Sequence, residues 1–137
     1  MTEKLLRWLD IAVYAVFAAF AFIVGPRDVW WFVGLSLATL TVPVWFASRW
    51  HLGASFSASA QARKLVTTGP YAKFRHPVYV FGSVAWAGAL MGLLGWRAIV
   101  IWVFIVLVEA IRVRREERVL AEAFGEEWAA YKASTWF

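Results

Sequence analysis

The chain has 137 residues, of which 62% are hydrophobic and only 17% are charged, and it contains no cysteine. An ordinary globular domain is about 45–50% apolar and about 25% charged, so this composition argues against a soluble or a disordered chain. The absence of cysteine excludes disulfides, cysteine-ligated zinc, iron–sulfur clusters and a thiol nucleophile. The net charge of +5 does not indicate a nucleic-acid partner, because the basic residues lie between long apolar runs.

Charge-poor stretches divide the chain into predicted membrane helices. Residues 29–48 and 76–96 contain no charged side chain when histidine is taken as neutral, and about 20 apolar residues cross a bilayer core. An apolar segment before Gly25 and another after Trp96 complete the pattern, which predicts transmembrane helices over about 8–24, 29–47, 78–94 and 96–110. We therefore expect an all-α integral membrane bundle of about four transmembrane helices, forming a single domain over residues 1–137.

The distribution of basic residues predicts the orientation of this bundle. The predicted loop over residues 49–76 has no acidic residue and carries Arg49, Arg63, Lys64, Lys73 and Arg75. The positive-inside rule places such a loop in the cytoplasm, so both termini and the helical segment over 111–137 are expected on the same side. The chain is thus predicted to be a multi-pass membrane protein in contact with the lipid bilayer.

Residues suited to ligand binding gather in the second half of this loop. A glycine–proline pair at 69–70 marks a turn, and Pro77 suits the first position of the following helix. The loop therefore delivers Arg75, His76 and Tyr79 to a helix N-terminus, where unpaired N–H groups attract carboxylates or phosphates. The alternative interpretation is an interfacial anchor, since tyrosine and basic side chains are ordinary at a membrane boundary.

A second cluster follows the last predicted membrane helix. Arg112 and Glu116 are four residues apart and share a helix face, while Glu117 falls in an apolar stripe with Val113 and Leu120. A carboxylate near a packed surface needs a cationic partner, from either the protein or a ligand. The alternative is a surface ion pair of little energetic weight, and the sequence leaves both interpretations open.

Several other chemistries are not indicated. The chain has no glycine-rich nucleotide motif, no Walker loop, no H-E-x-x-H and no G-x-S-x-G. Its two histidines, His51 and His76, are far apart in sequence, so a histidine-based metal site is not expected. Gly88 and Gly92 form a G-x-x-x-G pair, which predicts close helix packing rather than a ligand role.

A set of motifs occurs in order over about residues 50 to 132. They are Leu52-Gly53-x-x-Phe56-Ser57, Leu65-Val66-Thr67-x-Gly69-Pro70-Tyr71, Arg75-His76-Pro77-x-Tyr79, Arg112-x-x-x-Glu116-Glu117 and Phe124-Gly125-Glu126-Glu127-Trp128-x-x-Tyr131-Lys132. In this order and spacing the chain resembles the isoprenylcysteine carboxyl methyltransferase and phospholipid methyltransferase group of integral membrane enzymes. It departs from the group at Phe81, where a glycine is usual.

The resemblance implies S-adenosylmethionine as cofactor, held without a Rossmann domain by the cytoplasmic loop and the C-terminal helix. Carried over residue by residue, it implies a cofactor site formed by Leu65, Val66, Tyr71, His76, Pro77, Val78, Tyr79 and Glu116. It also implies that Arg112 faces the substrate as the catalytic residue. The chemistry of the residues agrees, because a glutamate suits the cationic part of S-adenosylmethionine and a guanidinium suits a carboxylate.

The expected function is S-adenosylmethionine-dependent methyl transfer to a lipophilic or small acceptor, expected to be a carboxylate, at the cytoplasmic membrane surface. An ionised carboxylate needs no general base, whereas a thiol or an amine needs a proton acceptor, for which the sequence shows no strong candidate. Two alternatives remain open. One is an NADPH-dependent membrane reductase of the sterol-reductase type, suggested by the basic loop, and the other is a non-catalytic membrane scaffold.

Overall fold

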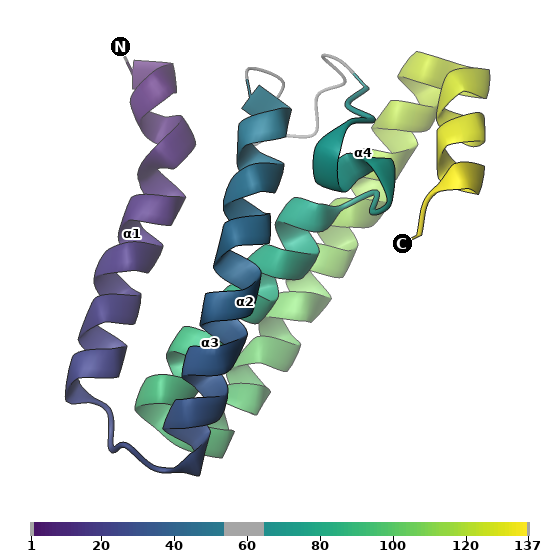
Figure 1. Ribbon diagram of the computed structural model, residues 1–137. Helices are drawn as coiled ribbons and strands as arrows, with labels where there is room; N and C mark the ends of the chain where they lie inside the picture. The colour runs from purple at the N-terminus through teal and green to yellow at the C-terminus, as the bar shows by residue number, and fades with distance from the viewer. Residues whose placement is uncertain (1, 54–64, 137) are drawn as a thin grey trace.

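Four long helices make up the fold in the computed structural model, which describes residues 2–53 and 65–136 (Figure 1). They are α1 (Thr2–Val24), α2 (Val29–Leu52), α3 (Pro77–Leu94) and α4 (Ala98–Ser134). Two short 3-10 turns accompany them, η2 (Gly69–Ala72) before α3 and η3 (Gly95–Arg97) between α3 and α4. Within the described residues there is no strand, only an isolated bridge between Phe74 and Trp136. The predicted all-α class is confirmed.

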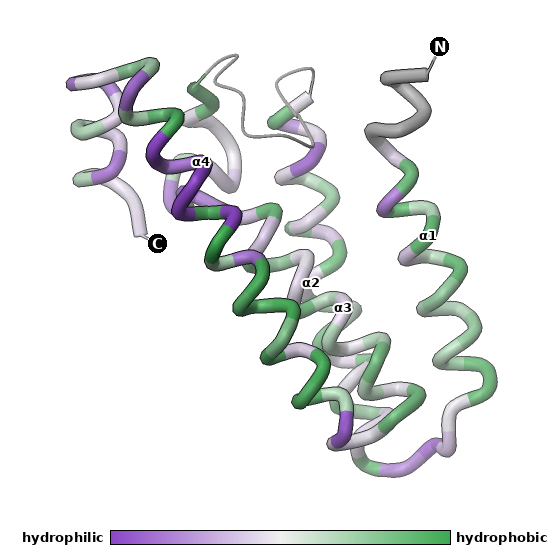
Figure 2. Tube along the Cα trace, turned by 180° about the vertical axis from the view of Figure 1, so that it is seen from behind, coloured by the Kyte–Doolittle hydropathy of each residue, from purple (hydrophilic) through white to green (hydrophobic). Residues whose placement is uncertain are grey.

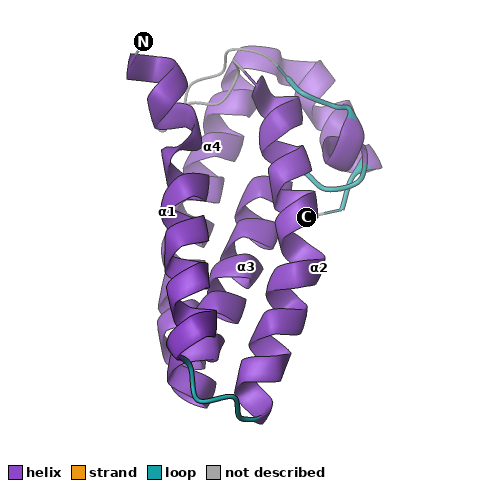
Figure 3. Ribbon diagram, turned by 60° about the vertical axis from the view of Figure 1, so that its left-hand side comes forward, coloured by secondary structure: helices purple, strands orange, loops and turns teal. Residues whose placement is uncertain are grey.

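The helices place the connections at two opposite ends. The short link over residues 25–28 and the turn η3 lie at one end, and Figure 3 shows this link far from the other described loops. The segment over residues 65–76 and the chain's C-terminal part lie at the opposite end, which we call the loop end (Figure 1). The central helix is α3, which packs most extensively on α2 and also contacts α1 and α4.

Small residues let α2 and α3 approach closely. A Cβ atom added to Gly88 would lie 2.6 Å from the carbonyl oxygen of Gly34, so only glycine fits at this contact. Nearer the loop end, Tyr14 of α1 and Trp45 of α2 pack on Ala85 of α3 in the buried core. The Tyr14 hydroxyl donates to the Ala85 carbonyl oxygen at 3.3 Å. The predicted packing role of Gly88 is therefore confirmed.

Large apolar side chains cover the outside of the bundle. On α1 and α4 the side chains of Val16, Ile23, Val100, Phe104 and Leu107 are all at least 60% exposed. Contiguous apolar surface of this kind is unfavourable in water and favourable in lipid. Figure 2 shows the apolar part of α4 running toward η3, with its hydrophilic residues nearer the loop end.

Two helical stretches are long and apolar enough to cross a membrane. They are Val29–Leu52, which is α2, and Pro77–Ser134, which comprises α3, η3 and α4, while a shorter apolar stretch covers Trp8–Val24 of α1. Together with the lipid-suited surface, they indicate a membrane protein. The expected number of crossings and the expected side of the loop stay predictions.

The boundary between α2 and the loop differs from the expected one. The helix continues past residue 47 to Leu52, and it ends where Gly53 adopts a φ of +48°. Arg49 therefore belongs to the last turn of α2 rather than to the loop, and its buried side chain forms an ion pair with Asp10 of α1. No residue between position 47 and Gly53 breaks a helix, and the ion pair of Arg49 with Asp10 stabilises the additional turn of α2. Of the predicted basic loop residues, Arg63 and Lys64 lie outside the described residues.

A glycine divides α4 near its C-terminal end. Gly125 has φ +49° and ψ −117°, a conformation that residues with a side chain rarely adopt. The chain turns there, so the part after Gly125 runs back beside α4 at the loop end (Figure 1). Nothing in the sequence from Trp96 to Phe124 breaks a helix, so Gly125 is predicted to end the long helix, and the structure confirms this break.

Candidate functional site

The start of α3 forms one wall of the site. His76 is the N-cap residue and is 7% exposed, and the buried ring of Pro77 follows it in the first helical position. The N–H groups of Tyr79 and Val80 both donate to the His76 carbonyl oxygen at 3.1 Å. Because these two N–H groups are already used within the turn, and Pro77 has none, this helix start offers fewer donors to an anion than the sequence predicts.

The turn before α3 is seated against the end of α2. Gly69 has φ +61°, and a Cβ atom added there would lie 2.3 Å from Nε2 of His51. Glycine is therefore required by its backbone conformation, whereas the exposed ring of His51 can move away from an added Cβ atom. The contact between Gly69 and His51 holds η2, which begins at Gly69, against the end of α2. Tyr71, in the same turn, is buried.

Polar side chains of α3 and α4 face one another below this turn. Glu109, Arg112 and Glu116 are spaced three and four residues apart, so they lie on one face of α4. This face meets Tyr79 and Ser83, which are four residues apart on α3. We call these five residues the polar seam.

The upper part of the seam joins the two predicted key residues of α4 to Tyr79. The guanidinium carbon of Arg112 lies 5.6 Å from the centroid of the Tyr79 ring, in a cation–π arrangement. The Tyr79 hydroxyl lies close enough to the carboxylate of Glu116 for the two groups to interact. Tyr79 thus connects a cation and an anion that the sequence places on one helix face.

Glu116 has one unsatisfied oxygen. Its Oε2 atom is buried and has no hydrogen-bond partner among the described residues. Tyr71 lies close enough that burial, and then the charge of Glu116, raises the pKa of the Tyr71 hydroxyl, which therefore stays protonated near neutral pH. A buried carboxylate oxygen without a donor is costly, so this position is suited to a cationic ligand.

The neighbouring Glu117 holds three cationic or polar partners. Its oxygens lie 3.0 Å from Nζ of Lys132, 3.2 Å from Nε2 of His76 and 3.4 Å from Nε of Arg75. Burial on its own would raise the pKa of the Glu117 carboxyl, but hydrogen bonds from Lys132 and His76, together with their charges, lower it overall. Glu117 thereby ties α4 to the start of α3 and to the C-terminal segment.

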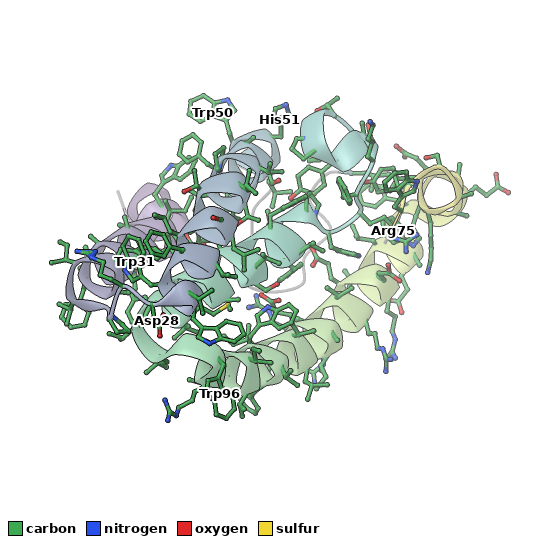
Figure 4. All side chains as sticks on the ribbon, turned by 60° about the horizontal axis from the view of Figure 1, so that its bottom comes forward. Asp28, Trp31, Trp50, His51, Arg75 and Trp96 are labelled. Atoms are coloured by element: carbon green, nitrogen blue, oxygen red, sulfur yellow. The ribbon has the colours of Figure 1, made fainter. Side chains whose placement is uncertain are left out.

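The C-terminal segment, residues 126–136, is fastened to the loop that precedes α3. The Tyr131 hydroxyl donates to the Tyr71 carbonyl oxygen at 2.8 Å, and Nη1 of Arg75 donates to the Lys132 carbonyl oxygen at 3.1 Å. The Trp136 N–H donates to the Lys73 carbonyl oxygen at 2.7 Å. Figure 4 shows Arg75 directed toward this segment. The segment therefore braces the wall of the site from outside.

The structure brings together most of the predicted site residues. Tyr71, His76, Tyr79, Arg112 and Glu116 all lie at the loop end, around the seam and the Glu117 contacts. The remaining predicted residues are placed differently. Leu65 and Val66 are half-buried in the coil before η2, Pro77 is fully buried, and Val78 packs against the apolar core around Trp45. A cofactor contact by these four residues stays a prediction.

The departure from the family motif at Phe81 has a structural explanation. The Phe81 ring packs edge-to-face on Phe74, with centroids 5.3 Å apart, so it fills space under the loop. Gly82, the next residue, faces α2, where an added Cβ atom would lie 2.9 Å from Nε1 of Trp45. The small residue at this point therefore serves helix packing.

Sequence analysis did not single out Glu109 and Ser83. The side chain of Glu109 lies close enough to Ser83 and Arg112 to interact with both, while the Ser83 hydroxyl donates to the Val80 carbonyl oxygen at 3.0 Å. The available signal is the spacing, because Glu109 ends a charge-free run three residues before Arg112, and Ser83 follows Tyr79 by one helical turn. The partners of Glu117 had no comparable signal, since they lie on two segments that are distant from Glu117 in the sequence.

With this geometry established, the chain can be compared with known proteins. Residues 21–127 match the profile of the phospholipid methyltransferase family. The chain belongs to the phospholipid methyltransferase family. This confirms the predicted family and, with the apolar helices, supports a membrane methyltransferase.

One curated relative matches over a large part of this family member. It is the cobalt-zinc-cadmium resistance protein CzcN of Cupriavidus metallidurans, 33% identical over 105 residues, which are 75% of this chain and 44% of that protein. The chain thus spans less than half the length of this relative. Across the described parts of the chain, no group of three or more His, Cys, Asp or Glu residues is placed to hold a metal ion.

Proposed function

We propose that this family member is an S-adenosylmethionine-dependent methyltransferase. Its acceptor is a lipophilic or small molecule that presents a carboxylate at the cytoplasmic surface of the membrane. The family supplies the reaction class. The apolar surface of the bundle suits an acceptor that is dissolved in the bilayer.

The observation that carries the proposal is the unsatisfied Oε2 atom of Glu116. S-adenosylmethionine has two cationic groups, a sulfonium and an ammonium, and either one stabilises a buried carboxylate that lacks a donor. Tyr71 and Tyr79 border this carboxylate, and aromatic rings favour a cation nearby. The residues present therefore fit the cofactor at the end of the seam that Glu116 occupies.

Arg112 is the residue suited to the acceptor. Its guanidinium carbon lies 5.6 Å from the centroid of the Tyr79 ring, and a guanidinium has paired N–H donors of the kind that bind carboxylates. When bound, S-adenosylmethionine supplies the methyl group, and a carboxylate acceptor leaves as a methyl ester. The protein's own contribution is to align the two molecules and to exclude water from between them.

The first test is a comparison of two cofactors on the detergent-purified chain. S-adenosylhomocysteine is expected to raise the melting temperature, and NADPH is not, because Glu116 favours a cationic ligand over a phosphate. Glu116→Gln is expected to weaken S-adenosylhomocysteine binding by about tenfold, since it removes the charge at the unsatisfied oxygen. Glu122→Gln, at an exposed position of the same helix, is the matched control.

Two results would contradict this proposal. Stabilisation by NADPH alone would favour the reductase alternative. Equal S-adenosylhomocysteine affinity in the parent and in Glu116→Gln would remove Glu116 from the cofactor site. A subsequent assay with N-acetyl-S-farnesylcysteine, a lipophilic carboxylate, would test the acceptor class by formation of the methyl ester.

A further inference from the structure

The exposed face of α4 is apolar over the first half of the helix. Its most exposed side chains recur at spacings of four, three and four residues, which places them in one line along the helix. They are Val100, Phe104, Leu107 and Ile111, each more than half exposed. Such side chains are unfavourable in water and favourable against acyl chains. This line, which we call the outer stripe, therefore faces lipid.

Three arginines continue the outer stripe toward the loop end. Arg114 and Arg115 follow Ile111 by three and four residues, and Arg118 follows these two by four and three. All three side chains are exposed. The surface of the stripe thus changes from apolar to positively charged within one helical turn. Arginines at such a boundary lay their stems along the apolar surface and place their charges in the polar layer beyond it.

The length of the apolar stretch agrees with the thickness of a bilayer. At its other end, the guanidinium carbon of Arg97 lies 5.6 Å from the centroid of the Trp96 ring, and tryptophan is typical of membrane interfaces. The eighteen positions from Arg97 to Arg115 correspond to a rise of about 27 Å along a helix. A hydrocarbon core is roughly 30 Å thick. The arginines at the two ends of the outer stripe therefore reach the two headgroup layers of one bilayer.

The three arginines of the outer stripe form no ion pair within the described part of the chain. Glu117, three residues after Arg114, is held by cations of two other segments. Glu116 is two positions after Arg114, about 200° around the helix, so it lies on the opposite face. Glu122 follows Arg118 by one turn and lies farther from the apolar half of α4. The three adjacent charges are therefore available to an external anion.

We propose that Arg114, Arg115 and Arg118 bind the headgroups of anionic phospholipids in the leaflet at the loop end. Continuity with the outer stripe favours a lipid over a water-soluble anion, because one phospholipid matches both parts of this face. Its acyl chains cover the apolar side chains, and its phosphate reaches the arginines. These contacts fix the depth of α4 in the bilayer. The inference does not depend on the proposed function, since lipid binding requires neither cofactor nor acceptor.

The test compares two lipids that share their acyl chains and differ in headgroup charge. The full chain in detergent is titrated with phosphatidylglycerol and with phosphatidylcholine, and bound lipid is measured by native mass spectrometry. The parent is expected to bind phosphatidylglycerol about thirtyfold more tightly. Replacing all three arginines by glutamine is expected to reduce this preference to less than about threefold. Replacing all three by lysine is expected to retain most of it, because lysine keeps the positive charge.

Single variants separate the site from the net charge of the protein. Arg118→Gln is expected to lower the preference about threefold. Lys73→Gln is the matched control, because it removes one exposed positive charge from the segment before α3, and it is expected to leave the preference unchanged. Equal effects of these two variants would overturn the inference, and they decide the question where the triple variant does not fold. A parent that binds both lipids equally would also overturn it and would leave this face to a water-soluble anionic partner.

Discussion

The hydroxyl of Tyr131 donates a hydrogen bond to the carbonyl oxygen of Tyr71 at 2.8 Å, across sixty positions of the chain. This contact joins the C-terminal segment to the turn that borders the seam. Both tyrosines are buried, and burial raises the pKa of the Tyr131 hydroxyl to about 12, so the donor keeps its proton over the physiological range. The geometry of the site therefore depends on a segment that follows the long helix.

Tyr131→Phe tests this bracing. Removing the hydroxyl leaves the Tyr71 carbonyl oxygen without this donor, at a cost of about 0.5–1.5 kcal/mol. We expect the melting temperature to fall and S-adenosylhomocysteine to bind about three- to tenfold more weakly, measured by calorimetry. Tyr14→Phe removes a buried hydroxyl from the helix core instead and is expected to lower stability alone. Similar binding losses in both variants would refute a specific bracing role.

Tyr79 offers a test that separates its ring from its hydroxyl. Tyr79→Phe keeps the ring beside Arg112 and removes the hydroxyl that interacts with Glu116, so weaker S-adenosylhomocysteine binding is expected with an unchanged KM for the carboxylate acceptor. Tyr79→Ala removes both contacts and is expected to impair both. Steady-state methyl transfer and equilibrium binding give the two quantities. A higher acceptor KM in Tyr79→Phe would contradict this division.

The stability of the fold is expected to depend on pH through the ionisation of the Glu117 carboxyl. Its pKa is lower in the folded chain than the ordinary value of 4.5, so its contacts stabilise the fold above that value and are lost as the pH falls through the lowered pKa. Glu117→Gln is therefore expected to be less stable than the parent at pH 7, with the difference shrinking below about pH 4.5. Melting temperatures in detergent from pH 7 to pH 3 would measure this.

The control for this pH series is Glu122→Gln, which changes an exposed carboxylate on the same helix. It is expected to follow the parent across the range, because an exposed carboxylate contributes little to stability. A difference between the parent and Glu117→Gln that stayed constant with pH would show that the lost packing, rather than the charge of Glu117, stabilises the fold.

Gly34 tests the close contact between α2 and α3. An added Cβ atom would lie 2.4 Å from the carbonyl oxygen of Gly88, which is backbone and cannot rotate away. Gly34→Ala is expected to force the helices apart and to destabilise the bundle by about 1–3 kcal/mol. Leu40→Ala removes a side chain that is 72% exposed on the same helix and is expected to have a smaller effect. Thermal unfolding in detergent compares the two.

The sequence by itself determined the helices and part of the site. The charge-free runs located α1 to α3, Pro77 marked the start of α3, and Gly125 marked the break in α4, because these signals are local. The four-residue spacing likewise placed Arg112 and Glu116 on one face of a helix. The end of α2 was less well predicted, since its continuation depends on the Arg49–Asp10 ion pair with another helix.

The tertiary structure alone decided which partner each carboxylate has. Glu116 and Glu117 are adjacent in sequence, yet one lies beside Tyr79 in the seam and the other contacts His76, Arg75 and Lys132. Glu109 likewise comes close to Ser83 only because α3 packs against α4. The physical reason is that neighbouring positions of a helix point in different directions. Their surroundings are then set by how the helices pack and by where the C-terminal segment returns after Gly125.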